Sequence, residues 1–311
     1  MAELRKITRK EILDGALSDI DFTEERGVAF DRKIENRDGV TCWLNVTIQM
    51  ILCSMDYSQD FSASSALGYK LETAAHSRRV IESESIKRLI QREVEINGER
   101  FQHILTGEQG ARDILILLGE NMASWMDIFC HLYHTTVQTI SCKYCQSQSV
   151  RAQEDAQLYY EIECPRDQSN MKRWIESLVN KGTDIEEYKC LGCKEKQNAF
   201  LQSQIKTEAS SNFLIVLIKR SEVTYNNRIT ATDDITLIDS NNVPRSYTPL
   251  SVIYHVGGVR SKQGSVRHYL CDVKSKVDGN WYRTSDATQP KRLKKEEVSK
   301  EGYIILYMRK S

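Results

Sequence analysis

Apolar side chains recur at helical spacing through the first part of the chain, from about residue 41 to residue 133. The first stripe falls near i, i+4, i+7 and i+8, which predicts one broad apolar face of an amphipathic helix. Its members are Trp43, Leu44, Ile48, Ile51 and Leu52. Similar stripes run through residues 81–94 and 111–122. Residues 1–26 are mostly charged and polar, and we expect a short helix or a flexible arm there.

The pattern becomes strand-like after Val137. Phe213 to Ile218 is a continuous apolar run of six residues, the length of a buried central strand. Short alternating or β-branched runs predict further strands at residues 136–140, 158–162, 251–256, 268–273 and 303–308. A helical first part followed by a strand-rich second part predicts an α+β architecture.

Charge and apolar run length narrow the possible functions. The 311 residues carry 43 basic and 43 acidic side chains, whereas a protein built to grip nucleic acid or anionic lipid needs a large positive excess. The longest apolar run is far too short for a membrane span, and no apolar stretch follows the charged N-terminus as in a signal peptide. We therefore expect an intracellular protein, cytoplasmic or nuclear, with neither nucleic acid nor membrane as partner. We also expect it to be a monomer.

The nine cysteines, an odd number, do not suggest a disulfide framework. Four of them form two C-x-x-C pairs, Cys142 with Cys145 and Cys190 with Cys193. This spacing lets both sulfurs of a pair reach one ion, and two pairs complete the tetrahedral four-thiolate site typical of structural Zn²⁺. The alternative of four buried thiols is disfavoured by polar neighbours. A catalytic zinc ion is disfavoured too, because four thiolates leave no open position for water.

Cys42 stands immediately before the first predicted helix, shortly after Gly39, which would allow a tight turn. A thiol at a helix N-terminus faces the positive end of the helix dipole, which favours the nucleophilic thiolate. A single cysteine beside apolar residues is nevertheless more often a core residue. A catalytic role for Cys42 therefore requires a base.

Among the six histidines, His268 has the most informative surroundings. It begins a predicted strand, and Asp278-Gly279 downstream is a turn signal between two strands. Such a hairpin would place Ser285 and Asp286 beside His268, where a polar group could orient the imidazole. Without further context, such a histidine is more often a satisfied surface or core residue.

These features follow the order found in ubiquitin-specific proteases, a family of cysteine deubiquitinases that the chain resembles from about residue 36 to its end. Residues 39–49 resemble the cysteine box G-N-T-C-[YFW]-x-N-S-x-L-Q, and residues 109–115 resemble the Q-D-A-x-E-F-L segment. The two C-x-x-C pairs match the zinc knuckles of the family's fingers. The remaining matches are the L-K-R-F strand at 217–220, the histidine box at 247–257, 268–269 and 281–286, and the closing strand at 303–307.

The resemblance implies a papain-like cysteine protease fold with the shape of a hand over residues 27–311, after an N-terminal extension. A helical thumb would span about 27–135, zinc-bearing β fingers about 136–213, and a β-rich palm about 214–311. The active cleft would lie between thumb and palm, and one structural Zn²⁺ would be held by the two cysteine pairs.

The implied activity is thiol-dependent hydrolysis of the isopeptide bond after the C-terminal glycine of ubiquitin. Cys42 would attack the carbonyl, and His268 would take the thiol proton and later protonate the leaving lysine amine. Water would then release ubiquitin from the acyl-enzyme. The partner would be ubiquitin or a ubiquitin-like modifier together with its conjugates.

Three positions depart from the family's pattern. The asparagine that stabilises the oxyanion usually stands five residues before the cysteine, where this chain has Arg37, with Asn36 one residue earlier. Losing such a donor costs roughly 2.7–4 kcal/mol of transition-state stabilisation, unless Asn36 reaches the site through a local insertion or Arg37 substitutes for it. Arg267 replaces the glycine before the histidine. Ser285 occupies the position of the third triad member, usually Asp or Asn, and Asp286 follows in support.

These departures leave alternatives open. The chain could be a catalytically weak or inactive relative that binds ubiquitin, or a protease for another ubiquitin-like modifier. Retention of both Cys42 and His268 weighs against an inactive relative. A zinc-finger nucleic-acid protein is remote, because the basic stretch at residues 291–295 is followed at once by Glu296 and Glu297 and fits a solvated face.

Overall fold

The computed structural model describes the chain from residue 32 onward, with gaps. The described residues are 32–36, 41–58, 61–76, 80–97, 110–121, 123–151, 156–164, 172, 182–220, 227–256 and 268–310. The predicted arm at residues 1–26 lies outside them, as do Gly39, Arg37 and Arg267. Helices come first along the chain and strands follow, so the predicted α+β class is confirmed.

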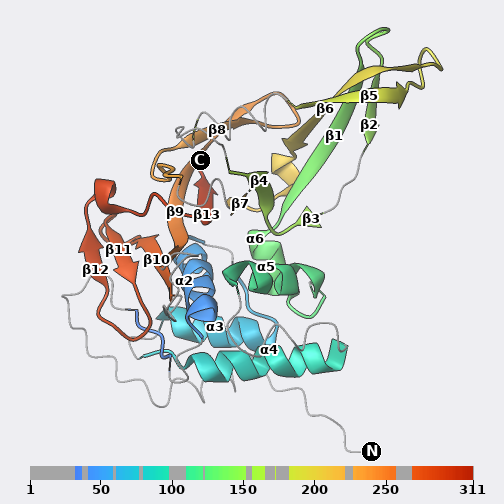
Figure 1. The fold of residues 1–311 in the computed structure, drawn as a ribbon. Helices are drawn as coiled ribbons and strands as arrows, with labels where there is room; N and C mark the ends of the chain where they lie inside the picture. The colour runs from blue at the N-terminus through green and yellow to red at the C-terminus, as the bar shows by residue number, and fades with distance from the viewer. Residues whose placement is uncertain are drawn as a thin grey trace, which may run out of the picture.

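Helices fill the first part of the described chain and gather at one side of the molecule (Figure 1). They are α2 (Cys42–Tyr57), α3 (Ala66–His76), α4 (Ser83–Asn97), α5 (Ala111–Glu120) and α6 (Met126–Leu132). None of the helices in the described part of the chain has both the length and the apolar character needed to cross a bilayer.

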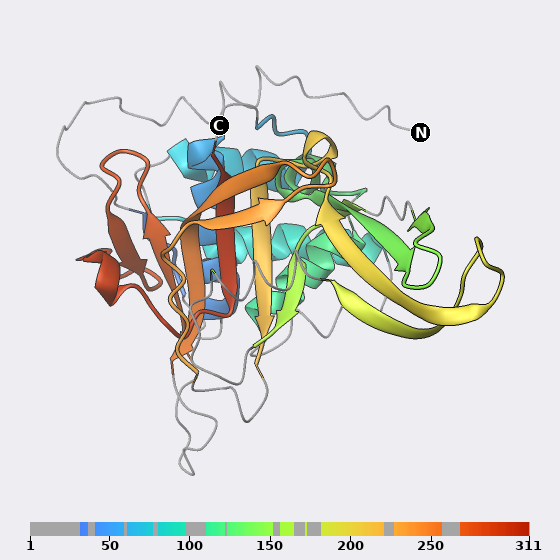
Figure 2. The same cartoon turned by 90° about the horizontal axis from the view of Figure 1, so that it is seen from above.

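A five-stranded sheet forms the fingers, which extend away from the helices (Figures 1 and 2). Its strand order is β2-β1-β6-β5, with β3 also paired to β1, and all pairs are antiparallel. The hairpins β1–β2 and β5–β6 carry the two C-x-x-C pairs at their tips. The strands are β1 (His134–Cys142), β2 (Gln148–Arg151), β3 (Ala156–Gln157), β5 (Thr183–Lys189) and β6 (Lys196–Ile205).

An eight-stranded sheet forms the palm, in the order β12-β11-β10-β9-β13-β7-β4, with β8 paired to β9. The strand predicted to be central and buried is β7: its apolar run is buried throughout, but it lies second from the edge of the sheet, between β13 and β4. β4 falls within the range expected for the fingers, yet it pairs in parallel with β7 of the palm. The strands are β4 (Tyr160–Glu163), β7 (Phe213–Lys219), β8 (Ile235–Ile238), β9 (Pro244–Val256), β10 (His268–Lys274), β11 (Trp281–Thr284), β12 (Lys291–Leu293) and β13 (Ile304–Arg309).

Each face of the palm sheet buries its own apolar core. One core joins the sheet to the helices and includes Cys271 and Val273 of β10. The other lies on the opposite face and includes Trp281, Leu293 and Ile235. The palm is therefore covered on both sides, which explains why its central strands are continuously apolar.

α2 is the central helix of the molecule. Every residue in 42–55 is buried, so the helix is covered on all sides rather than on the single face that its spacing predicted. It packs against β9 and β10 on the palm and against α3, α4 and α5. Buried polar side chains need hydrogen-bond partners, and the Thr47 hydroxyl accordingly donates to the Trp43 carbonyl at 3.0 Å.

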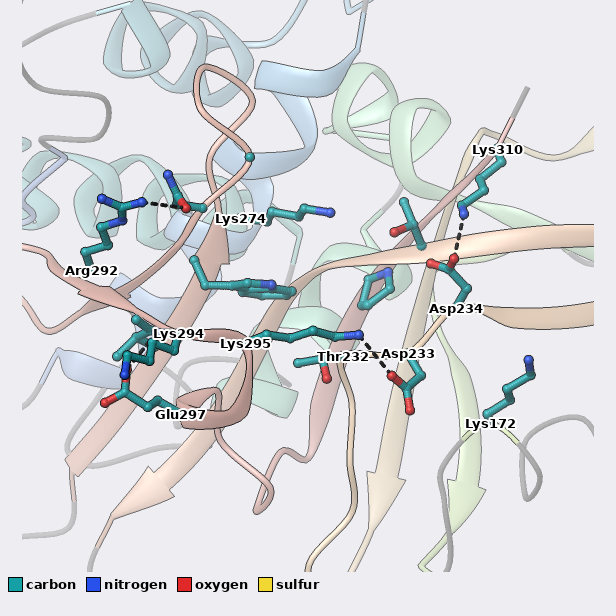
Figure 3. A pocket seen from close by; sticks show the side chains of 16 residues that line it. Lys172, Thr232, Asp233, Asp234, Lys274, Arg292, Lys294, Lys295, Glu297 and Lys310 are labelled. Carbon is teal, nitrogen blue, oxygen red and sulfur yellow. Dashed lines mark hydrogen bonds and ion pairs between the residues drawn. The ribbon is translucent and has the colours of Figure 1, made fainter.

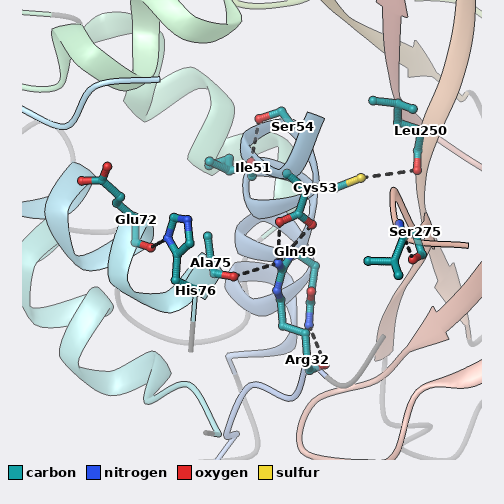
Figure 4. Close-up of polar contacts among 12 residues, drawn as sticks. Arg32, Gln49, Ile51, Cys53, Ser54, Glu72, Ala75, His76, Leu250 and Ser275 are labelled. Carbon is teal, nitrogen blue, oxygen red and sulfur yellow. Dashed lines mark hydrogen bonds and ion pairs between the residues drawn. The ribbon is translucent and has the colours of Figure 1, made fainter. Parts of the chain in front are cut away.

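Polar contacts fix α2 to the elements around it (Figure 4). Arg32 donates to the Asp56 carboxylate at 2.9 and 3.0 Å and to the carbonyl of Ala75 in α3 at 3.4 Å. Toward the palm, the Cys53 thiol contacts the carbonyl of Leu250 in β9 at 3.6 Å. The C-terminal part of α2 is therefore fixed to α3 and to the palm.

Candidate active site and metal centre

Cys42 is the first residue of α2. The main-chain N–H groups of Leu44 and Asn45 both donate to the Thr41 carbonyl at 3.0 Å, which forms the first helical turn around the cysteine. Only 6% of the Cys42 surface is exposed. The thiol therefore stands at the positive end of a long buried helix, where a thiolate is favoured.

His268 and Ser285 meet at the end of a hairpin. β10 and β11 pair in antiparallel register, as the Asp278-Gly279 turn signal predicted, and Gly279 adopts a φ of +70° in that turn. The pairing brings Nε2 of His268 to 2.8 Å from the hydroxyl of Ser285. The residue in the position of the third triad member is thus in hydrogen-bond contact with the imidazole.

The carboxylate of Asp286 is fixed between two amide side chains and the imidazole. Its Oδ1 accepts a hydrogen bond from Asn45 Nδ2 at 2.8 Å, and its Oδ2 accepts one from Asn36 Nδ2 at 2.9 Å. Oδ2 lies 3.9 Å from Nε2 of His268. Asp286 has a φ of 45°, in the left-handed region, which turns the chain directly after Ser285. A fixed negative charge therefore lies close to the histidine.

Asn36 joins this carboxylate to the start of α2. Its Oδ1 accepts hydrogen bonds from the main-chain N–H of Thr41 at 3.1 Å and from the Thr41 hydroxyl at 2.9 Å. A continuous chain of contacts therefore runs from the neighbour of Cys42 through Asn36 and Asp286 to His268. The structure brings Asn36, His268, Ser285 and Asp286 together at this end of the helix.

Asn45 is a residue of the site that our sequence reasoning did not single out. It is 2% exposed, and its Nδ2 donates to the Glu35 carbonyl at 3.0 Å as well as to Asp286. Residues three apart on a helix share a face, so Asn45 lies on the same side of α2 as Cys42. The available signal was an amide three residues after Cys42 in a helix rich in apolar residues, because a buried amide requires specific partners.

The first turn of α5 lies beside the strand that carries His268. The main-chain N–H of Gly110 donates to the Asp113 carboxylate at 2.7 Å, which caps the helix. A Cβ atom at Gly110 would lie 3.8 Å from the hydroxyl of Tyr269, the residue after His268. Helix and palm strand therefore meet next to the candidate catalytic groups.

The four paired cysteines converge at the finger tips. The sulfurs of Cys142, Cys145, Cys190 and Cys193 all lie within 4.8 Å of one another, and those of Cys145 and Cys190 are 3.5 Å apart. A tetrahedral site with Zn–S bonds of about 2.3 Å needs sulfurs about 3.8 Å apart. The size and chemistry of the cluster therefore fit one structural Zn²⁺, as predicted.

Local backbone geometry supports the same ligand set. The residue after each pair, Gln146 or Lys194, has a left-handed φ of 55° or 60°, so both turns fold back in the same way. The Ser147 hydroxyl, with the N–H groups of Cys193 and Gly192, lowers the pKa of the Cys190 thiol to about 6. This environment favours the thiolate, which is the form that binds metal.

Comparisons with known proteins agree with this architecture. A model of the ubiquitin carboxyl-terminal hydrolase family matches residues 33–307. The chain is similar to a chain of the SAGA DUB module, Ubp8/Sgf11/Sus1/Sgf73, bound to monoubiquitin. The TM-score is 0.67 at 16% identity, and the match covers 97% of this chain and 75% of that one. For the module bound to ubiquitin aldehyde, the TM-score is 0.64 at 17% identity, with coverage of 97% and 75%. For yeast SAGA DUBm with a mutant Sgf73, the TM-score is 0.63 at 16% identity, with coverage of 97% and 74%. No curated protein matches the chain in sequence.

Proposed function

Because the chain belongs to the ubiquitin carboxyl-terminal hydrolase family, we propose that it hydrolyses the isopeptide bond after the C-terminal glycine of ubiquitin through an acyl-enzyme on Cys42. The family makes the chain a cysteine deubiquitinase. The observation that carries the residue assignment is the 2.8 Å contact between His268 and Ser285, linked through Asp286 and Asn36 to the helix start at Cys42. That ubiquitin is the modifier is supported by the structural neighbours, which are bound to monoubiquitin or ubiquitin aldehyde.

In this proposal Cys42 is the nucleophile and His268 the general base. Sγ attacks the glycine carbonyl while the imidazole takes the thiol proton, and the tetrahedral intermediate collapses to a thioester. The imidazolium returns the proton to the leaving lysine amine. Water, deprotonated by the same imidazole, then hydrolyses the thioester and restores the free thiol with ubiquitin as product.

Ser285 and Asp286 share the task that a single Asp or Asn usually performs. The Ser285 oxygen accepts the Nε2 hydrogen of His268 and fixes the plane of the ring. Asp286, 3.9 Å from the same nitrogen, supplies the negative charge that stabilises the imidazolium. Asn36 and Asn45 hold that carboxylate in place.

The oxyanion is proposed to form at the start of α2. One hydrogen of Asn36 Nδ2 bonds to Asp286, and the second is available as the donor that the family usually takes from a neighbouring position. The C-terminal tail of ubiquitin is proposed to pass between the first turn of α5 and Tyr269. We further propose that the enzyme acts as a monomer, in the cytoplasm or nucleus.

The decisive experiment is reaction of the purified protein with ubiquitin that carries a C-terminal electrophile. We expect a covalent adduct with the wild type and with Cys130→Ala, which removes an exposed thiol, but none with Cys42→Ala. Bound ubiquitin without an adduct would replace the proposal with a binding-only relative. Absence of both would direct the same assay to other modifiers that end in Gly-Gly.

A further inference from the structure

A groove of about 1150 Å³ lies on the palm face opposite α2 and has an excess of basic side chains. It is bounded by residues 232–234, by the middle of β9, by the ends of β10 and β13, and by the β11–β12 hairpin with the 3₁₀ turn after it, Lys295–Glu297 (Figure 3). Six basic and three acidic side chains line it. Because the whole chain is neutral, this local excess is a property of the groove.

All three carboxylates of the groove already have partners in the chain. Asp233 pairs with Lys295 at 3.2 Å, and Asp234 pairs with Lys310 at 2.5 Å. The third, Glu297, accepts the main-chain N–H of Lys294 at 2.7 Å and so caps the turn. These contacts leave no internal carboxylate in the groove free to neutralise its other cations.

Of the four remaining cations, Lys172 has contacts of its own, and the other three form no ion pair with a carboxylate in the part of the chain that the structure describes. They are Lys274 at the end of β10, Lys294 after β12, and Arg292, whose guanidinium donates to the Asn280 side-chain oxygen at 3.0 Å. The charges around the groove also stabilise the ionised carboxylate of Asp234, which lies inside it. Burial raises the pKa of Asp234, yet hydrogen bonds from Lys310 and Thr248 and the field of Lys274 lower it overall.

The arrangement of these groups matches an extended acidic chain better than a compact anion. Figure 3 shows the basic side chains spread along the groove, from Arg292 and Lys294 at one end through Lys274 and Lys295 to Lys310. A single small anion would contact only part of this row. A nucleic acid carries a phosphate on every residue, whereas a peptide can place uncharged residues opposite the carboxylates of Asp233 and Asp234.

Apolar surface lines the groove between the cations. Trp281 and Leu293 belong to the core on this face and are 6% and 5% exposed, and Pro249 lines the same wall. A peptide can place carboxylates on the lysines while an apolar side chain covers this surface, whereas a phosphate backbone cannot. Acidic and apolar residues in one short segment are therefore the complementary chemistry.

The groove is remote from the candidate active site. His268 is the first residue of β10 and Lys274 the last, so six strand steps of about 3.3 Å separate them by about 20 Å. The groove residues Trp281 and Leu293 also belong to the core on the face away from α2. A bound segment would leave Cys42 accessible.

We propose that this groove is a docking site for an acidic peptide segment of a partner protein. Carboxylates of the segment contact Lys274, Lys294 and Arg292, and an apolar side chain packs over Trp281. Docking at this site would bring the partner protein to the enzyme at a surface about 20 Å from His268. Binding does not require the hydrolase activity, so the two proposals can fail separately.

The test is fluorescence anisotropy with a labelled peptide in which Glu and Leu alternate, against a peptide in which Gln replaces each Glu. We expect the wild-type protein to bind only the acidic peptide. Lys274→Glu combined with Lys294→Glu should weaken binding by about tenfold or more. Arg88→Glu combined with Arg92→Glu makes the same charge change on α4 of the thumb and should change affinity less than about twofold.

Several results would overturn the proposal. They are equal binding of both peptides, equal loss in the groove and thumb variants, or an oligonucleotide of similar length displacing the peptide from the groove. If the charge reversals unfold the protein, Lys274→Gln with Lys294→Gln replaces them, with circular dichroism as the check. Carbodiimide coupling of the peptide to wild-type protein should give cross-links at Lys274 or Lys294, and cross-links confined to the thumb would contradict the assignment.

Discussion

Asp286 has more contacts in the candidate site than the serine that precedes it. Its two oxygens accept hydrogen bonds from Asn45 and Asn36, and it lies close to the imidazole of His268. Ser285 makes one contact with that ring. A hydroxyl can orient an imidazole, but only a carboxylate carries the charge that stabilises the protonated form. Asp286 should therefore contribute more to catalysis than Ser285.

Substitutions of these two residues should therefore lower the catalytic efficiency by different amounts. Ser285→Ala removes one neutral hydrogen bond and should lower kcat/KM for a ubiquitin C-terminal fluorogenic conjugate by about tenfold. Asp286→Asn removes the charge and should lower it by about a hundredfold or more. Steady-state kinetics on both variants provides the measurement. A larger loss for Ser285→Ala would show that the serine alone is the third triad member.

Asn45 should act through Asp286 rather than through fold stability alone. Asn45→Leu keeps the branched shape of the side chain but removes a donor to the carboxylate, so we expect kcat/KM to fall by about tenfold and the free energy of unfolding by about 1–3 kcal/mol. Thr47→Val on the same helix removes a buried hydrogen bond remote from Asp286 and should affect stability alone. If Asn45→Leu and Asp286→Asn combine additively, the proposed coupling is absent.

At the scale of elements, the two finger hairpins depend on the metal site at their tips. Each hairpin ends in a short turn, and the cysteine cluster joins the turns of β1–β2 and β5–β6. Short exposed strands lack a large core of their own, and a bound ion supplies the missing free energy. The fingers should therefore be the part of the molecule most sensitive to metal removal.

Cys190→Ser should abolish stable zinc binding, whereas Cys130→Ser, outside the cluster, should retain about one ion per chain. Metal content is measured by atomic emission. Hydrogen exchange should then show loss of amide protection in β5 and β6 with protection of α2 retained. Two results would contradict a role of the zinc site that is confined to the fingers. One is wild-type protein that contains no zinc after purification with metal present, and the other is an equal loss of amide protection in α2.

Two buried histidines should make the whole molecule sensitive to acid. Burial lowers the pKa of His131 to about 4 even though Ser54 contacts its ring, and burial alone lowers the pKa of His134 to about 4. An unfolded histidine titrates near 6.5, so between these values the unfolded chain binds protons that the folded chain does not. The free energy of unfolding should therefore fall as pH falls from about 6.5 to about 4, by about 3 kcal/mol for each histidine.

His134→Phe tests directly whether the free energy of unfolding falls with pH because His134 is buried. Both ring nitrogens of His134 are buried without a hydrogen-bond partner in the described structure, so phenylalanine should be tolerated. Urea unfolding across the pH range should then show a shallower decline than in the wild type. A decline of unchanged slope would mean that His134 does not titrate in this window.

The sequence predicted features whose determinants are close together in the chain. The Asp278-Gly279 turn set the hairpin that joins His268 to Ser285, and the cysteine spacing predicted both knuckles. Contacts between distant segments were not predictable in this way. Asn45 and Asp286 are 241 positions apart, and no local pattern pairs them. The complete burial of α2 likewise depends on which elements cover it.

One consequence follows from the position of β4. The chain leaves the finger sheet after β3, adds a parallel strand beside β7 in the palm, and then returns to the fingers at β5. Glu161 on this strand also accepts a hydrogen bond from Arg112 of α5, so one short segment joins all three parts of the hand. The fingers are therefore not a transplantable module. A chimera that exchanged them for the fingers of a relative would also have to include a strand of the palm and its contact with the thumb. These parts should therefore evolve together.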